Sequence, residues 1–102
     1  MQFPPYSYLA VLKAEANDYG LVQRFLKYAA DSAHELAQKV MVYDPVRPQM
    51  ERLKGMERGQ LLMHASQRAP LQRLLHALVS LLRAHPLNTK VRWAVDVDPL
   101  EF

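Results

Sequence analysis

The stretch VRWAVDVDP at residues 91–99 decides the fold, because it supplies the last predicted strand of a sheet. Side chains alternate between the two faces of a strand. We expect the mainly apolar set to face a core: Trp93, Val95 and Val97. The other set then faces away from that core: Arg92, Ala94, Asp96 and Asp98. The two aspartates raise the question of whether the chain carries a catalytic or metal site.

Three earlier stretches have the same strand character. Residues 6–16 (YSYLAVLKAEA) place Tyr8, Ala10, Leu12 and Ala14 on one face of a strand, and Leu9, Val11 and Lys13 on the other. Residues 40–46 (VMVYDPV) predict a second strand, which Pro45 and Pro48 mark as an edge. Residues 60–66 (QLLMHAS) predict the third strand.

Two stretches have helical spacing instead. Asn17 and Asp18 supply N-cap chemistry for a helix over about 18–38, with apolar residues three and four apart. A second helix begins near Pro70 and must stop at His85-Pro86. Its apolar stripe, which we expect to lie in the core, consists of Leu71, Leu74, Leu75, Leu78, Leu81 and Leu82.

The resulting order is β-α-β-β-α-β. Right-handed crossovers convert this order into an α+β two-layer sandwich, a four-stranded sheet with both helices on one face, which is the split βαβ or ferredoxin-like plan. Residues 1–102 are expected to form a single domain. The sheet face away from the helices mixes leucine and valine with charges, which favours a docking surface.

Composition excludes several kinds of site. The chain has no cysteine, so disulfides, thiolate zinc sites and cysteine nucleophiles are impossible. No apolar run approaches the roughly 20 residues that span a bilayer, and the start lacks a signal-peptide layout. The three glycines form no phosphate-binding loop, and no serine has a Gly-x-Ser-x-Gly setting. We therefore expect a cytoplasmic, monomeric protein that is not an enzyme.

The paired carboxylates Asp96 and Asp98 have two interpretations. A magnesium or catalytic site would need further oxygen ligands or a base nearby. Alternatively, both are solvated carboxylates, which discourage an edge strand from pairing with another chain or form ion pairs with Arg92. The second interpretation is favoured, because the motif alone is a weak signal.

The basic charge is concentrated in the middle of the chain. The net charge is +3, and residues 61–90 contain four basic groups and no acidic one. Residues 47–58 (RPQMERLKGMER) predict a projecting hairpin whose cations could contact phosphates: Arg47, Arg52, Lys54 and Arg58. Arg68 and Arg73 on the second helix could extend this patch. A solvated loop remains the alternative, since Glu51 and Glu57 dilute the charge and no aromatic residue is available to stack on bases.

Three stretches resemble the C-terminal domain of bacterial PriA, primosomal protein N′: residues 3–16, 40–66 and 91–102. The most specific parts are the Pro-Pro-Tyr opening at 4–6 and the ending at Trp93, Asp96, Val97, Asp98 and Pro99. Pro45, Pro48 and the Gln-Leu-Leu strand at 60–62 support the resemblance, which covers essentially the whole chain. The hairpin departs from the family pattern. In the family this hairpin is often richer in glycine, arginine and aromatic residues, whereas here it reads Lys-Gly-Met-Glu-Arg-Gly.

The resemblance implies that the chain is a domain excised from an ATP-dependent replication-restart DNA helicase. ATP, magnesium and zinc would then be bound elsewhere in the parent, and this domain would hold no cofactor. The implied fold is similar to a small-subunit ribosomal protein. Two functions follow as hypotheses: binding of branched or fork DNA beside the motor domains, or docking onto the helicase core or primosome partners such as single-stranded DNA-binding protein.

Overall fold

The computed structural model describes residues 8–46, 52–53 and 55–97, with backbone only at 52–53. The order β-α-β-β-α-β is confirmed, with one additional two-residue strand, β3, and a short 3-10 turn, η1. The elements are β1 (Tyr8–Ala16), α1 (Tyr19–Leu36), β2 (Val40–Val42), β3 (Arg52–Leu53), β4 (Met56–Ala65), α2 (Arg68–Ala84), η1 (Pro86–Thr89) and β5 (Arg92–Val97).

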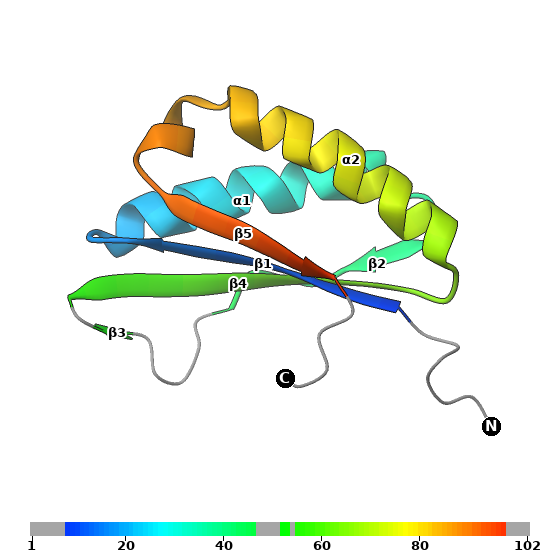
Figure 1. Ribbon diagram of the computed structural model, residues 1–102, viewed down its shortest axis with the longest axis horizontal. Helices are drawn as coiled ribbons and strands as arrows, with labels where there is room; N and C mark the ends of the chain where they lie inside the picture. The colour runs from blue at the N-terminus through cyan, green and yellow to red at the C-terminus, as the bar shows by residue number, and fades with distance from the viewer. Residues whose placement is uncertain (1–7, 47–51, 54, 98–102) are drawn as a thin grey trace.

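The sheet is antiparallel, and its strands lie in the order β2-β4-β1-β5. The short β3 pairs with β4 outside this path. Both helices cover the same face, as Figure 1 shows with α1 and α2 on one side of the sheet. The predicted two-layer sandwich is therefore correct, and in the described part of the chain neither α1 nor α2 lies over the other sheet face.

The helix α1 begins where the sequence places its cap. Asp18 has an extended backbone, and its carboxylate accepts a hydrogen bond from the Gly20 amide at 2.8 Å. This bond satisfies one of the amides that have no partner in the first helical turn. The apolar stripe then lies against the sheet, with Phe25 and Leu26 among its fully buried members.

The helix α2 follows its predicted leucine stripe with one exception. Leu71, Leu74, Leu75, Leu78 and Leu82 are buried, but Leu81 is 37% exposed and does not belong to the core. The helix ends before His85-Pro86 as expected, and His85 Nδ1 accepts a hydrogen bond from the Leu87 amide at 3.1 Å. Proline has no amide to continue the helical ladder, so the chain turns into η1 there.

Small residues bring the two layers together. Ala10, Ala14 and Ala16 of β1 are buried under the helices. Gly59 of β4 lies so close to α1 that a Cβ there would be 2.6 Å from Leu26 Cδ1. The helical layer consequently packs closely against the sheet where β1 and β4 pass beneath α1.

The last strand follows the predicted alternation, but its end is not buried. Trp93 and Val95 pack against the core, and the Trp93 ring centroid lies 5.8 Å from that of Phe25. The Trp93 indole Nε1 donates to Asn88 Oδ1 at 2.8 Å. The prediction that Val97 lies in the core is wrong, because Val97 is 49% exposed. Its cross-strand partner is the buried Ala10, so Val97 points to the predicted face of the sheet but at a position that the core does not cover.

The third strand is longer than predicted. β4 begins at Met56 rather than at Gln60, and its first residues form a hairpin with β3, in which Gly55 adopts a φ of 79°. β2 is an edge strand, as Pro45 and Pro48 after it indicated, although it is shorter than the predicted strand at 40–46. After β2 the chain forms a bulge at Asp44–Pro45. The Tyr43 amide donates to the Leu62 carbonyl and Val46 forms a bridge with Gln60, so two residues on this side lie opposite one residue of β4.

Candidate nucleic-acid interface

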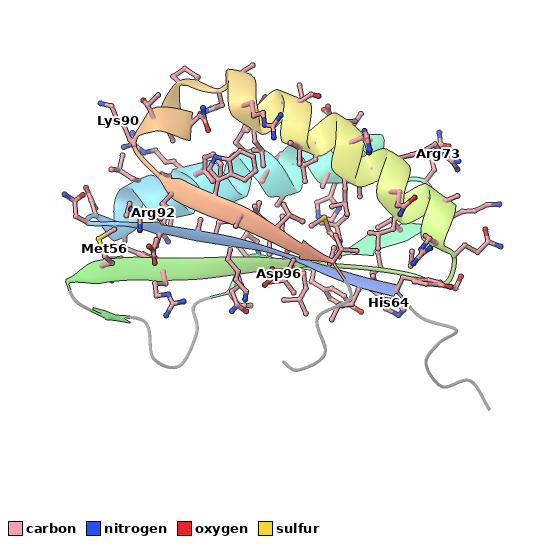
Figure 2. The ribbon with its side chains drawn as sticks, in the orientation of Figure 1. Met56, His64, Arg73, Lys90, Arg92 and Asp96 are labelled. Carbon is pink, nitrogen blue, oxygen red and sulfur yellow. The ribbon has the colours of Figure 1, made fainter. Side chains whose placement is uncertain are left out.

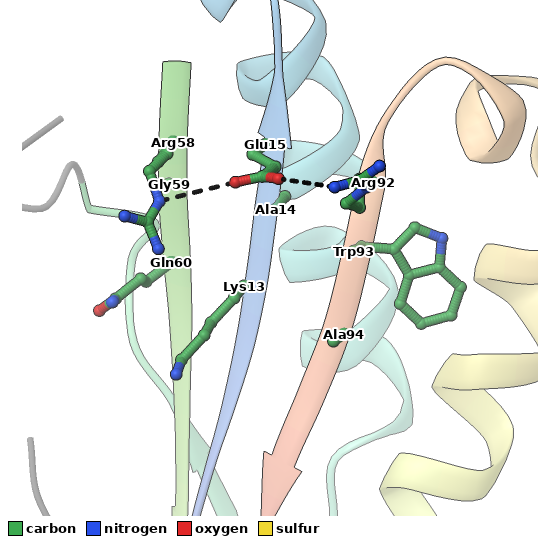
Figure 3. Close-up of a pocket in the computed structure, with 9 residues that line it drawn as sticks. All are labelled: Lys13, Ala14, Glu15, Arg58, Gly59, Gln60, Arg92, Trp93 and Ala94. Atoms are coloured by element: carbon green, nitrogen blue, oxygen red, sulfur yellow. Dashed lines mark ion pairs between the residues drawn. The ribbon is translucent and has the colours of Figure 1, made fainter. Parts of the chain in front are cut away.

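The sheet face without helices carries a line of charged residues across three strands. Glu15 of β1 lies directly opposite Arg58 of β4 and Arg92 of β5. Residues directly opposite each other in a sheet point to the same face. Figure 3 shows the Glu15 carboxylate between the two arginine side chains.

The two ion pairs of Glu15 are loose. Arg58 Nε lies 3.8 Å from Glu15 Oε1, and Arg92 Nη1 lies 3.6 Å from Glu15 Oε2. Charge-assisted hydrogen bonds between such groups are about 2.7–2.9 Å long. The arginine side chains are 38% and 83% exposed, whereas that of Glu15 is 28% exposed. Both guanidinium groups are thus held near the carboxylate while most of the Arg92 side chain faces solvent.

A second ion pair lies next to this line. Lys13 Nζ is 2.6 Å from Asp96 Oδ2, and both side chains are about half exposed. Asp96 is a half-exposed carboxylate, but it pairs with Lys13 and not with Arg92, the partner that the sequence offered as an alternative, because the register places Arg92 opposite Glu15. Asp98 lies outside the described residues. Within the described part of the chain, no group of three or more potential metal ligands comes together.

We call five residues of this face the charged strip: Lys13, Glu15, Arg58, Arg92 and Asp96. Three cations face two carboxylates, so the strip has an excess of one positive charge. A pocket of about 210 Å³ opens beside it, lined among others by Lys13, Gln60 and Arg92. An arginine presents planar N–H donors that match phosphate oxygens, and the pocket is large enough for such a group.

The structure places the described members of the predicted site in two regions. Arg58 is in the charged strip, and Arg52 is opposite Glu57 in the β3–β4 hairpin, with its side chain not described. Arg47 and Lys54 lie outside the described residues. Arg68 and Arg73 are on α2, in the helical layer, and the Arg68 guanidinium lies 5.9 Å from the Tyr8 ring centroid. Figure 2 shows Arg73 and Arg92 toward opposite ends of the molecule.

Lys13, Glu15 and Arg92 are the members of the strip that were not among the functional residues predicted from the sequence. Alternation correctly placed Arg92 and Lys13 on the face away from the helices. The missing information was the pairing register between β1, β4 and β5, which alternation within one strand does not provide.

An apolar group lies on the same side of the edge strand. Val40 and Val42 pack against the core, so Met41 between them faces the opposite side of the sheet. Met41 is 58% exposed, and Tyr43 and Val46 beyond it are 43% and 48% exposed. Val11, on the same sheet face, is only 3% exposed.

Neither α1 nor α2, the helices of the described residues, is long and apolar enough to cross a membrane.

Comparisons with known proteins agree with this architecture. A family model described as "Primosomal protein N C-terminal domain" matches residues 1–100. The de novo designed protein Foldit4 superposes with a TM-score of 0.69 at 11% identity, covering 91% of this chain and 97% of that chain. A dimeric ferredoxin-like protein from an uncultured marine organism gives a TM-score of 0.59 at 13% identity, covering 89% and 92%. At such identities the two structures establish a shared ferredoxin-like fold.

Proposed function

The chain belongs to the primosomal protein N C-terminal domain family, which implies a role in the replication-restart primosome, and on this premise we propose that it is an accessory DNA-binding domain. In this proposal it binds branched or fork DNA beside the motor domains of the parent helicase. The chain itself performs no reaction. ATP, magnesium and zinc would be bound by the rest of the parent, in the bacterial cytoplasm.

The observation that carries this proposal is the pair of arginines on the helix-free sheet face. Arg58 and Arg92 come from different strands and flank one carboxylate, so their charges exceed what Glu15 neutralises. Lys or Arg side chains that neutralise DNA phosphates release counterions, and this release supplies most of the sequence-independent affinity. The arrangement suits contacts to phosphates, which position a protein on DNA without reading its bases.

The β3–β4 hairpin would add further cations to the same contact. Arg58 is two residues from Met56, where the hairpin strand begins, and Arg52 pairs with Glu57 in the hairpin. We therefore keep Arg47, Arg52, Lys54 and Arg58 as the main proposed DNA contacts and add Arg92, the partner of Arg58 across Glu15. Arg68 and Arg73 on α2 would touch a separate part of a branched substrate, because they belong to the other layer of the sandwich.

The test is a fork-DNA titration of the 102-residue chain at two salt concentrations, about 50 and 200 mM. Replacing Arg47, Arg52, Lys54 and Arg58 with alanine should weaken binding and make it less salt-dependent. The slope of the logarithm of the binding constant against the logarithm of the salt concentration should become shallower by about 0.9 for each phosphate that the variant no longer neutralises. A control variant removes three exposed cations of the helical layer, Arg24, Lys27 and Arg83. Unchanged affinity of the hairpin variant would sink the proposal.

A protein-docking module is the second candidate, favoured by the exposed apolar residues Met41, Tyr43 and Val46. The partner would be the helicase core or a primosome component such as single-stranded DNA-binding protein. Met41→Glu should abolish binding of the chain to the separately purified motor domains, measured by calorimetry. Leu81→Glu is the matched control, since Leu81 is also an exposed apolar residue but lies on α2. Equal binding by both variants would contradict docking through this surface.

A further inference from the structure

We propose that Glu15 is a built-in competitor for nucleic-acid phosphate at the Arg58–Arg92 pair. The inference rests on the proposed DNA-binding function and deepens it. Glu15 would occupy the inner side of both guanidinium groups and limit how tightly the sheet face holds a phosphodiester backbone.

The position of Glu15 is the first reason. It lies on the central strand β1, between β4 and β5, and both of its carboxylate oxygens face an arginine. Neighbouring strands are about 4.8 Å apart, so the backbones of Arg58 and Arg92 are separated by roughly 10 Å across β1. Two long side chains from either side can therefore converge above the carboxylate.

The length of the ion pairs is the second reason. Distances of 3.6 and 3.8 Å leave both guanidinium groups without a tight bidentate partner at Glu15. Each guanidinium has five N–H donors, and a single carboxylate cannot satisfy both sets. A phosphate approaching from solvent would find free donors on Arg92, which is 83% exposed. It would also meet the negative charge of Glu15 beneath them.

The neighbouring pair behaves differently. Lys13 and Asp96 are in direct contact at 2.6 Å, and their charges cancel. The carboxylate that faces two cations at once is Glu15, so removing its charge changes the local balance from one excess positive charge to two. Such a change strengthens binding to a polyanion and adds to its salt dependence.

The experiment uses Glu15→Gln, which preserves the shape of the side chain, in the 102-residue chain. Binding of a fluorescent forked oligonucleotide is measured by anisotropy between about 50 and 200 mM salt. We expect about threefold tighter binding at the lower concentration and a log–log salt slope steeper by up to about 0.9. A merely structural role of Glu15 would not steepen the salt slope. Thermal unfolding of the same sample verifies that the variant is folded.

Two controls separate a local effect from a general one. Asp31→Asn makes the same chemical change in the Lys27–Asp31 ion pair, whose side chains are 77% and 66% exposed on α1. It should leave the affinity for DNA nearly unchanged. In an Arg58→Ala/Arg92→Ala background, Glu15→Gln should lose its effect, because the cations that it masks are gone.

The outcomes are distinguishable. Tighter binding by Glu15→Gln alone, which disappears without the two arginines, supports the inference. Equal or weaker binding overturns it, as does a gain that Asp31→Asn matches or that survives removal of the arginines. In these cases the wild-type chain still binds DNA, and the proposed function stands. If neither the wild type nor Glu15→Gln binds DNA, the proposed function and the inference both fall.

Discussion

Gly59→Ala should destabilise the fold, because Gly59 is where β4 passes closest to α1. A Cβ at this position would lie 2.6 Å from Leu26 Cδ1 and 3.0 Å from Val22 Cγ1. Leu26 and Val22 are 1% and 0% exposed, so neither side chain has solvent into which it can move. The methyl group must displace α1 or force an unfavourable rotamer.

The magnitude follows from two opposing terms. Overpacking a well-filled core by one methylene costs about 1–3 kcal/mol. Replacing glycine by alanine in a strand recovers roughly 0.5–1 kcal/mol of backbone entropy, since Gly59 does not have a positive φ. The middle values of these two ranges, about 2 and about 0.75 kcal/mol, give a net loss of about 1.25 kcal/mol in the free energy of unfolding. For a domain of this size this loss corresponds to a fall in Tm of roughly 5–10 °C.

The assay is urea and thermal unfolding followed by circular dichroism, with a double-mutant cycle. Leu26→Ala removes the nearest atom, so Gly59→Ala should cost less in that background than in the wild type. Gly55→Ala is the contrasting variant: nothing lies within 4 Å of its Cβ position, and only the φ of 79° opposes it. A Gly59→Ala protein as stable as the wild type, or strict additivity with Leu26→Ala, would refute the proposed contact.

Three further predictions test the cap, the tryptophan and the carboxylate of the last strand. Asp18→Ala removes the N-cap of α1 and should lower the free energy of unfolding by about 0.5–2 kcal/mol, whereas Asp18→Asn should retain most of it. Trp93→Phe loses the hydrogen bond to Asn88 Oδ1 and should cost about 1 kcal/mol or more in urea unfolding; no loss would show that the bond contributes nothing. Magnesium titrated calorimetrically into the chain should give no saturable heat, because Lys13 already holds the Asp96 carboxylate; one-to-one binding that Asp96→Asn removes would revive the metal hypothesis.

The helices were predictable because their signals are local. Asp18 and the spacing of apolar residues place α1 within two residues of its observed ends. The predicted stop at His85-Pro86 likewise lies directly after the observed end of α2 at Ala84. The core prediction for Leu81 is wrong because the stripe does not specify its own edge. A leucine at the margin of a 100° stripe can lie on either side of it.

The strands were less predictable because they depend on partners far away in the sequence. Residues 56–59 are mostly polar or glycine and look like a loop, yet they form the beginning of β4, in which 57–59 pair with residues 14–16 of β1. Gly59 weakens the strand signal for the same reason that the fold requires it there, namely the close approach of α1. Packing therefore selected a residue whose own propensity opposes the strand.

The charged strip connects the register of the sheet to the proposed site. A one-residue shift of β4 against β1 would turn Arg58 toward the helices, where the layer is closed by alanine and leucine side chains. A two-residue shift would keep its face but place Met56 or Gln60 opposite Glu15. Among these registers of β4, only the observed one puts cations on both sides of this carboxylate, and opposite charges in directly facing pairs stabilise a sheet. Glu15 thus favours the register that brings Arg58 and Arg92 together, and the same carboxylate then competes with the phosphate that we propose they bind.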